Sequence, residues 1–300
     1  MKQEYSFDVF CVGAGTYDLV YSVDRDPQPD EKIRATSFTG CGGGPAANAA
    51  ITVSRLGLQA AFAGYLGKDI FGNAHNEELQ EAGVCTDYVT RGTYSSALSV
   101  VMVKPDGSRA LVNYRNPESY IVAGAIDFSK IAARIILFDG HEPYISPSLA
   151  RSARQRGIIT LLDAGSIHRG TEELAGLVDY LVCSERFGLD FTGETNEDKA
   201  LEKLSAYAPN IIITLGSRGL VWKNSVGTGQ LEAFTVKPID TTGAGDVFHG
   251  ALAACLAQKK GWLESLRYAS AAGALCCMKI GARLGIPTRS EVEKFLMAHA

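Results

Sequence analysis

The 300-residue sequence lacks a membrane-spanning run, a signal peptide and the positive charge typical of nucleic-acid-binding proteins. No apolar run reaches the ~18 residues that span a bilayer, and the first ten residues, MKQEYSFDVF, lack the apolar core of a signal peptide. The formal net charge is -4, so a broad basic surface is not expected. We therefore expect a cytoplasmic protein that binds neither membrane nor nucleic acid.

The sequence also lacks a cysteine framework. Its seven cysteines are odd in number and contain neither a CxxC pair nor the Cys/His spacing of a zinc site. Cys276 and Cys277 are adjacent and cannot easily bridge each other. Together with five scattered histidines, this pattern predicts reduced thiols and no structural zinc.

The composition, with 46% hydrophobic and 21% charged residues, is that of an ordinary globular protein. The length could hold two domains of average size, but α/β folds often use this much chain for one. No repeat, low-complexity tract or obvious linker interrupts the sequence. We expect residues 1–300 to form a single domain.

Strand-like and helical runs alternate along most of the chain. We expect strands at 7–12, 60–66, 135–138, 158–162, 180–183 and 211–215, and helices at 49–56, 73–82, 147–156, 172–176 and 196–207. Gly57 is placed as a helix C-terminal cap. The alternation predicts an α/β fold with a parallel sheet covered by helices on both faces.

Two early stretches do not fit this rhythm. The runs 97–103 and 109–114 flank Pro105-Asp106-Gly107, which is a hairpin signal. The segment 17–39 alternates weakly and carries many charges. We expect the two stretches to form an add-on sheet that projects from the main body.

Two common nucleotide motifs are absent. Gly13-Ala-Gly15 follows a strand, but a dinucleotide fingerprint needs glycine at position 18, where Asp18 stands, and no helical run follows. No stretch matches the glycine-rich P-loop either.

The stretch DTTGAGDVFHGAL, from Asp240 to Leu252, carries chemistry of another kind. The apolar spacing after it predicts a helix that begins near Gly245. The first amides of such a helix have no helical partner, so they can bind an anion. Asp246 would lie beside this turn as a base for a hydroxyl that attacks a phosphate. The same pattern also fits an ordinary helix start with an acid in its first turn.

This stretch resembles the C-terminal signature of the ribokinase-like (PfkB) carbohydrate kinases. GGGPAANAAITVSRLG, over 42–57, resembles their glycine motif, and ITLGSRG, over 213–219, resembles their nucleotide-binding turn. The resemblance covers essentially the whole chain. It implies an αβα sandwich with a mostly parallel central sheet and a small β-sheet lid, formed here by about 17–39 and 97–114. It also implies a kinase that uses ATP and Mg²⁺.

The resemblance assigns roles to individual residues. It makes Asp246 the catalytic base and the amides of Gly243, Ala244 and Gly245 an anion hole. Asp18, Gly43, Gly44 and Asn48 match sugar-contacting positions, although Asn48 could also cap a helix. Thr214, Gly216, Ser217 and Gly219 match nucleotide-contacting positions, although an ordinary strand and turn would look the same. Asp240 and Thr242 match ligands of a monovalent cation, K⁺, in some members, although both could simply shape the turn.

The sequence departs from the family near the magnesium site. The usual Asn-x-x-Glu reads Ser184-Glu185-Arg186-Phe187, so Glu185 is the candidate that remains. Within the family, the motifs are most similar to those of sulfofructose kinase and ketohexokinase-like members. That resemblance adds Lys32 and Asn113 on the lid, and His141, where the sulfofructose kinases have an arginine. Arg115 on the lid could compensate as an anion clamp, and His141 could equally be a solvated surface residue.

The sequence therefore predicts an ATP-dependent kinase for a hydroxymethyl group of a ketose-type sugar. Whether the sugar carries a sulfonate or a phosphate is open. A nucleoside kinase of the same fold is one alternative, but the charged lid segment 30–34 does not suggest a clamp for a base. A non-catalytic sugar or nucleotide sensor is the other, but such a protein should have lost Asp246 or Gly243-Ala244-Gly245. An apolar face of the lid predicts a homodimer through the lid.

Overall fold

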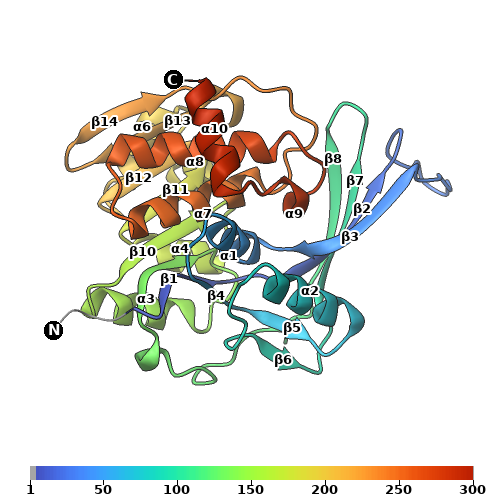
Figure 1. Cartoon of the computed structure of the whole chain (residues 1–300), viewed down its shortest axis with the longest axis horizontal. Coiled ribbons are helices and arrows are strands. Elements are labelled where there is room, and N and C mark those ends of the chain that lie inside the picture. Colours follow the sequence, from blue (N-terminus) through green and yellow to red (C-terminus); the bar gives the residue numbers. More distant parts are fainter. Residues whose placement is uncertain (1–4, 300) are drawn as a thin grey trace.

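An eight-stranded sheet lies at the centre of the computed structural model, which describes residues 5–299 (Figure 1). Its strands, in spatial order, are β14 (Gly227–Leu231), β13 (Leu220–Asn224), β12 (Asn210–Thr214), β11 (Tyr180–Ser184), β10 (Ile159–Ala164), β9 (Ala133–Phe138), β1 (Phe7–Val12) and β4 (Ala60–Ala63). The strands from β12 to β4 are parallel, whereas β13 and β14 are antiparallel. The predicted parallel sheet is confirmed, and the antiparallel edge was not predicted.

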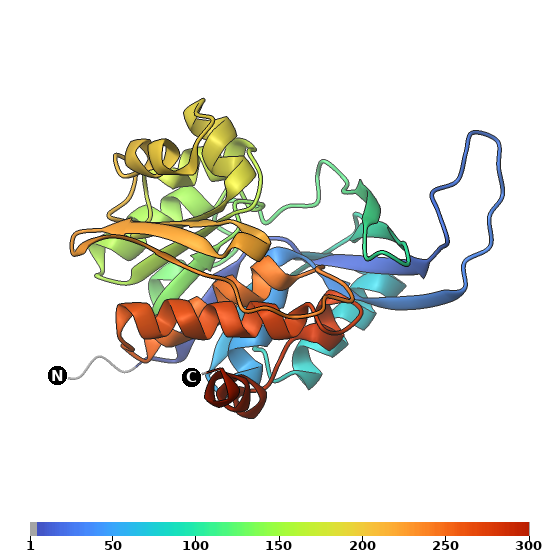
Figure 2. The same ribbon diagram turned by 90° about the horizontal axis from the view of Figure 1, so that it is seen from above.

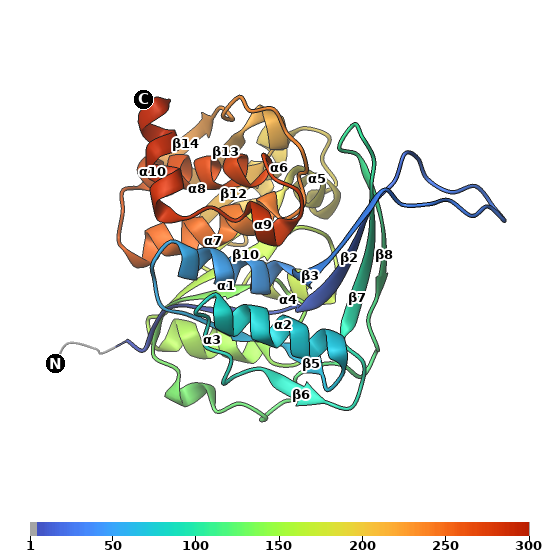
Figure 3. The ribbon, with the colours of Figure 1, turned by 45° about the vertical axis from the view of Figure 1, so that its right-hand side comes forward.

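Helices cover both faces of this sheet (Figure 3). One face packs against α1 (Pro45–Arg55), α2 (Ile70–Glu81), α7 (Ala244–Ala257), α8 (Trp262–Cys276) and α10 (Arg289–Ala298). The other packs against α3 (Ser146–Gln155), α4 (Arg169–Ala175), α5 (Glu185–Thr192) and α6 (Glu197–Leu204). Successive residues of β1 belong to opposite apolar clusters, Val9 and Cys11 to one and Phe10 and Val12 to the other. A parallel strand that is buried on both faces has to be apolar throughout.

A four-stranded sheet, which we call the lid, projects from one side of the body (Figures 1 and 3). Its order is β3 (Ser37–Gly43), β2 (Thr16–Ser22), β7 (Ala97–Val103) and β8 (Arg109–Tyr114). The expected hairpin has the predicted bounds. The other lid segment was predicted too short: it runs from Thr16 to Gly43, because β3 continues past residue 39. The loop between β2 and β3, 23–36, extends away from the body (Figure 2). The short strands β5 (Tyr65–Gly67) and β6 (Thr90–Gly92) form a separate pair.

The two faces of the lid differ in chemistry. Asp18, Ser99 and Asn113 lie directly opposite one another on β2, β7 and β8, so they share one face. The other face is apolar and partly exposed to solvent, and consists of Leu19, Tyr21, Phe38, Leu98, Val100, Met102, Val112 and Tyr114. We call this second surface the outer lid face.

Several element boundaries differ from the expected ones for local reasons. The helix expected at 49–56 begins at Pro45, because Gly44 adopts a positive φ of 95° and proline suits the first helical position. The strand expected at 60–66 divides at Gly64, where a side chain would collide with Phe62 and the carbonyl oxygen of Gly13. Gly57 follows α1 at a φ of 82°, as its predicted capping role requires. All seven cysteines are free, as predicted.

The described residues contain no helix that is both long enough and apolar enough to cross a membrane.

The buried carboxylate of Asp139, just after β9, connects three separate parts of the chain. It accepts hydrogen bonds from the backbone amides of Ala14 at 2.8 Å, Ala46 at 3.1 Å and His141 at 2.8 Å. A side chain at Gly13 would collide with this carboxylate, so glycine is needed there. Asp139 thus fixes the end of β1, the start of α1 and the loop after β9.

Replacing Asp139 with alanine should lower the free energy of unfolding by about 3 kcal/mol, because buried amides would lose their acceptor. Urea denaturation measures this change. The control is Asp190→Ala on α5, whose side chain is 58% exposed in an ion pair with Arg186 and should contribute less than ~0.5 kcal/mol. Equal unfolding midpoints for Asp139→Ala and the wild type would contradict this role.

Candidate active site

The helix α7 begins without a capping side chain. Its N-cap is Gly243, in the left-handed conformation at a φ of 78°, and Asp246 lies in its first turn. The first amides of a helix point outward and carry the positive end of the helix dipole. Because no side chain caps them, they can bind an anion. The Ala244 amide already donates a 3.3 Å hydrogen bond to the carbonyl oxygen of Thr241, which an anion would have to replace or share. The anion hole of Gly243, Ala244 and Gly245 therefore stays a prediction.

Asp246 is paired with Asn48 from α1. The Asn48 amide nitrogen donates a 2.6 Å hydrogen bond to Asp246 Oδ2, across 198 residues of sequence. The carbonyl oxygen of the same Asn48 side chain is buried and has no partner among the described residues. A buried acceptor without a donor is costly unless a ligand supplies one. The pair therefore offers a base and a free acceptor side by side.

The electrostatic environment favours the protonated form of several acids here. Burial raises the pKa of Asp246, although the hydrogen bond from Asn48 opposes this. Burial also raises the pKa of Asp18, against hydrogen bonds from Thr16 and Ser99. The pKa of Asp163 rises to about 7 through burial, and the charges of Asp246 and Asp139 add to this. A base with a raised pKa is better matched to neutral pH.

A histidine supports the first turn of α7 from below. His249 Nδ1 lies 2.6 Å from the carbonyl oxygen of Gly245 and 3.3 Å from Asp163 Oδ2. Its Nε2 lies 3.3 Å from the carbonyl oxygen of Val182. His249 therefore connects the start of α7 to the ends of β10 and β11.

The sugar-binding residues expected from the sequence lie together beside this turn. Gly43 packs so closely on Asp18 that a side chain there would collide with the carboxylate. Gly44, at a φ of 95°, packs on the carbonyl oxygen of Ala14 and leads directly into α1. Asp18, Gly43, Gly44 and Asn48 are thus brought together, and Asp246 contacts the last of them.

The expected substrate residues on the lid and near β9 are more dispersed. Asn113 is exposed but shares the lid row of Asp18. Lys32 is exposed on the 23–36 loop, outside the group formed by Asp18, Gly43, Gly44 and Asn48. His141 stacks on His168, with ring centroids 4.4 Å apart, at the carboxyl ends of β9 and β10.

Arg115 is committed to other partners, which weakens its predicted role as an anion clamp. Its guanidinium donates to the carbonyl oxygens of Ser119 and His141 and to Glu142, with a 2.8 Å ion pair to the carboxylate. Glu142 is fully buried, so the pair cannot separate without leaving an unpaired buried charge. Arg115 would have to break these bonds to meet a substrate anion.

The expected nucleotide residues form one turn at the carboxyl end of β12. Thr214 ends the strand, and residues 216–218 form a 3₁₀ turn closed by a 2.8 Å bond from the Leu215 amide to the Gly219 carbonyl. Gly219 has a φ of 90°, and a side chain there would collide with the carbonyl oxygen of Leu231. The structure therefore explains the glycine at 219 by local packing, and contact with a nucleotide stays a prediction.

The candidate metal residues occupy two places. Glu185 opens α5 and pairs with Arg218 at 2.5 Å, while Ser184 caps the helix and Phe187 is buried. Asp240 accepts from the amide and hydroxyl of Thr242 and from the Gly281 amide, at 2.6–2.8 Å. These bonds shape the turn before α7, and K⁺ would have to share the same oxygens.

Sequence reasoning missed four residues that the structure places at this site. Asp139 accepts from the Ala46 amide at the start of α1, Asp163 contacts His249 of α7, and Arg283 donates to the carbonyl oxygen of Gly42. The signal available was position alone, since Asp139 and Asp163 lie at or just after the carboxyl ends of buried strands. In parallel sheets this edge forms ligand sites.

Comparisons with known proteins show the family and the fold of this chain. A family model described as pfkB family carbohydrate kinase matches residues 6–289. A ribokinase of Bacillus subtilis is 29% identical over 294 residues, covering 96% of this chain and 99% of the relative. Fructokinase-1 of Zea mays is 30% identical, covering 87% of this chain and 90% of the relative. The structure of an Arabidopsis thaliana ribokinase complexed with ribose and ATP is similar, with a TM-score of 0.87, 27% identity and coverage of 97% and 98%.

Replacing Gly245 with valine should abolish most turnover without unfolding the protein. A side chain at Gly245 would meet no atom within 4 Å, so the fold has room for it, but the side chain would occupy the space above the α7 amides. Steady-state turnover with a thermal melt checks both parts. Gly243→Val is the contrasting variant, because a side chain there lies 2.5 Å from Ala282 Cβ and the backbone has positive φ, so it should lower stability as well. Normal turnover in folded Gly245→Val would place the anion elsewhere.

Proposed function

Because the chain belongs to the pfkB family of carbohydrate kinases, we propose that it transfers the γ-phosphate of ATP to a hydroxymethyl group of a ketose-type sugar. Asp246 is the general base and the amides of Gly243, Ala244 and Gly245 form the anion hole. The observation that carries this proposal is the Asn48–Asp246 pair at the uncapped start of α7.

The chemistry follows from these positions. Asn48 orients the Asp246 carboxylate, and its free carbonyl oxygen accepts a hydrogen bond from the sugar. The reacting hydroxyl gives its proton to Asp246 as its oxygen bonds to the γ-phosphorus, and the bond to the bridging oxygen of ADP breaks. Negative charge on the transferred group meets the α7 amides, whose orientation is fixed before the reaction.

Two acids at the carboxyl edge of the central sheet are candidates to hold a magnesium ion. Asp163, near the end of β10, would hold it together with ATP, and Glu185, directly after β11, would have to leave its ion pair with Arg218 to join them. Burial chiefly raises the pKa of Asp163 to about 7, with a smaller contribution from the charges of Asp246 and Asp139, and a bound divalent cation would stabilise its ionised form. When bound, Mg²⁺ neutralises phosphate charge.

The sugar site favours a neutral polyol over an anionic sugar. Asp18 is buried on the lid, and a carboxylate accepts hydrogen bonds from sugar hydroxyls. Arg115 is engaged with Glu142, and Lys32 and Arg34 are exposed on the 23–36 loop. The relatives named above are ribokinases and fructokinases, which supports a ribose- or fructose-like substrate.

The test is ADP release from ATP with fructose, ribose, their phosphates and a nucleoside. Asp246→Asn keeps the shape of the side chain but removes the base, so turnover should fall by ~10²–10⁴ while sugar and ATP binding remain. In the wild type, kcat should fall as the pH drops through the raised pKa of Asp246, because the carboxylate must be deprotonated to act.

Asn48→Ala provides a check on the sign of this pH effect. The Asn48 hydrogen bond lowers the pKa of Asp246, so its loss should move the acidic limb of the profile to higher pH. Near-wild-type turnover in Asp246→Asn would remove Asp246 from the mechanism.

We also propose that two copies associate through the outer lid face. This surface exposes Phe38, Val112 and Tyr114 by 57%, 63% and 53%, and β8 is an unpaired edge of the lid sheet. Exposed apolar faces of this kind are characteristic of interfaces.

Val112→Glu should convert the dimer to a monomer, because a charge cannot be buried there without a partner. Light scattering at micromolar concentration measures the mass. Val226→Glu, at a still more exposed valine on the β13–β14 turn, is the control and should leave the mass unchanged. A monomeric wild type would refute the dimer.

A further inference from the structure

A buried ionic cluster lies behind the glycine turn of the sugar site. We propose that Arg283 is a positioning residue that holds the glycine turn 42–44 in its sugar-binding shape and so sets sugar affinity. The inference rests on the proposed function, in that Asp18, Gly43 and Gly44 are taken to bind the sugar.

Side chains from two distant elements hold both polar groups of Gly42. Arg283, on α9 (Ala282–Gly285), donates from Nε to the Gly42 carbonyl oxygen at 2.6 Å, across 241 residues. The Gly42 amide donates to Glu78 Oε2 of α2 at 2.8 Å. Glu78 Oε2 also lies 3.8 Å from Arg283 Nε. The backbone on both sides of Gly42 is therefore oriented by the Arg283–Glu78 ion pair as well as by its pairing in strand β3.

The packing leaves no room for a side chain at either glycine. A side chain at Gly42 would lie 2.7 Å from Arg283 Nη2 and would collide with the His75 ring. A side chain at the next residue, Gly43, would collide with the Asp18 carboxylate. Consecutive glycines thus contact the Arg283 cluster on one side and the sugar-site acid on the other. Movement of Gly42 would therefore move Gly43 relative to Asp18.

The charge states in the cluster support each other. Arg283 Nη2 donates to His75 Nε2 at 2.6 Å, which requires a neutral imidazole. Burial lowers the pKa of His75 well below its usual value, and the Arg283 charge adds to this. Burial also lowers the pKa of Arg283, while the charges of Glu78, Asp18 and Asp246 oppose the change. Arg283 is thus a buried cation that faces the acids of the sugar site.

The cluster is not arranged for stability alone. Arg283 is only 6% exposed, yet its Nη1 has no partner among the described residues. An unpaired buried donor on a charged group destabilises the fold, and such departures concentrate at functional sites.

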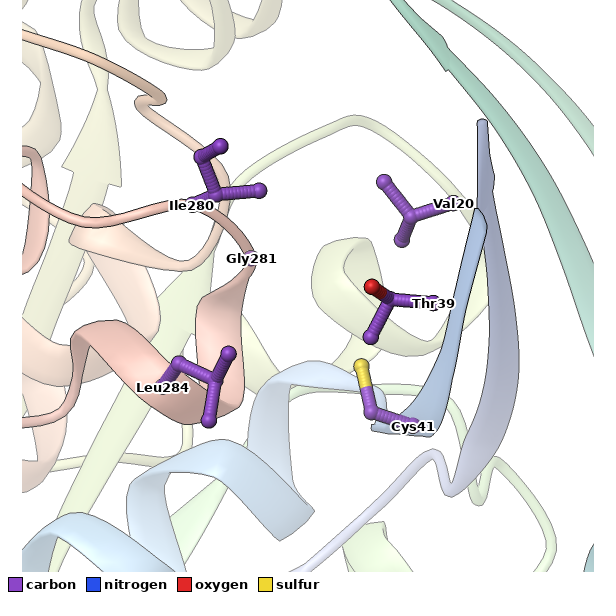
Figure 4. Close-up of a pocket in the computed structure, with 6 residues that line it drawn as sticks. All are labelled: Val20, Thr39, Cys41, Ile280, Gly281 and Leu284. Carbon is purple, nitrogen blue, oxygen red and sulfur yellow. The ribbon is translucent and has the colours of Figure 1, made fainter. Parts of the chain in front are cut away.

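The place of α9 explains how a C-terminal residue can act on the lid. Figure 4 shows Ile280 and Leu284 facing Val20, Thr39 and Cys41 across a small cavity of about 20 Å³. Arg283 lies in the same short helix as Leu284 and reaches the last residues of β3. It therefore joins the C-terminal segment to the lid strand that leads into α1.

The experiment compares Arg283→Met with Arg283→Lys in the full chain, using fructose and ribose as probes. Arg283→Met should raise the KM for sugar by roughly 10- to 100-fold, the effect of losing hydrogen bonds from a charged group. The KM for ATP should stay within about twofold, because the nucleotide turn is untouched. Loss of the Arg283 charge also raises the pKa of Asp246, so kcat is compared at a pH above the acidic limb, where it should change less than the sugar KM. Lysine should restore part of the affinity. The matched control is Arg289→Met, which removes another arginine that donates to a backbone carbonyl, that of Leu56 at 2.8 Å.

A milder variant covers the case in which Arg283→Met does not fold. Glu78→Gln keeps an acceptor for the Gly42 amide and removes only the charge, and its side chain is 30% exposed. It should raise the sugar KM several-fold in the same direction. An unchanged sugar KM in both Arg283→Lys and Glu78→Gln, or a loss shared equally by sugar and ATP, would overturn the assignment.

Calorimetric titration with fructose and ribose separates this inference from the proposed function. If the wild type binds a sugar but does not phosphorylate it, the proposed function fails, and the sugar Kd of the variants still decides the role of Arg283. If neither sugar binds the wild type, the inference is overturned as well, because there is then no sugar site to position.

Discussion

One carboxylate, that of Asp139, sets the geometry on which both halves of the active site depend. It accepts amide hydrogen bonds from Ala14, Ala46 and His141, so it aligns the end of β1 with the start of α1. The lid strand that carries Asp18 leaves from the first of these places, and the helix that carries Asn48 leaves from the second. Hydrogen bonds to a buried carboxylate are among the stronger ones in proteins, so this junction is rigid.

Around this junction, several polar groups lack a partner among residues 5–299. The side-chain carbonyl oxygen of Asn48 and Nη1 of Arg283 are buried without a hydrogen-bond partner there, and no side chain of that part of the chain caps α7. Each of these features destabilises the fold, and the two apolar clusters on either side of the central sheet offset the cost. A substrate that completes these bonds finds the donors and acceptors already oriented, which is how enzymes favour a transition state.

The sequence predicted the features whose residues are close together along the chain. Asp246 and its glycines lie within one stretch, and the hairpin at 97–103 and 109–114 is signalled by its own turn. By contrast, Asp139 and Arg283 act on backbone groups 93 to 241 residues away, and no local periodicity records such contacts. His249 lies in the same stretch as Asp246, but its partners, Asp163 and Val182, lie on other elements, so the local pattern does not reveal its role.

The charged residues of the lid show that closeness in sequence to a motif does not place a residue in the site. Lys32, Arg34 and Arg115 are close to sugar-site motifs in sequence, yet two are exposed on a loop and the third is neutralised by Glu142. The cation that faces Asp18 and Asp246 is Arg283, from the far end of the chain. Glu78, Asp18 and Asp246 outnumber this one cation, so the sugar end is suited to hydroxyl donors. The positive end of the α7 dipole lies on the other side of Asp246, which we assign to phosphate. Under this assignment, Asp246 lies between the sugar and the phosphate, and each side of it has the charge that suits its ligand.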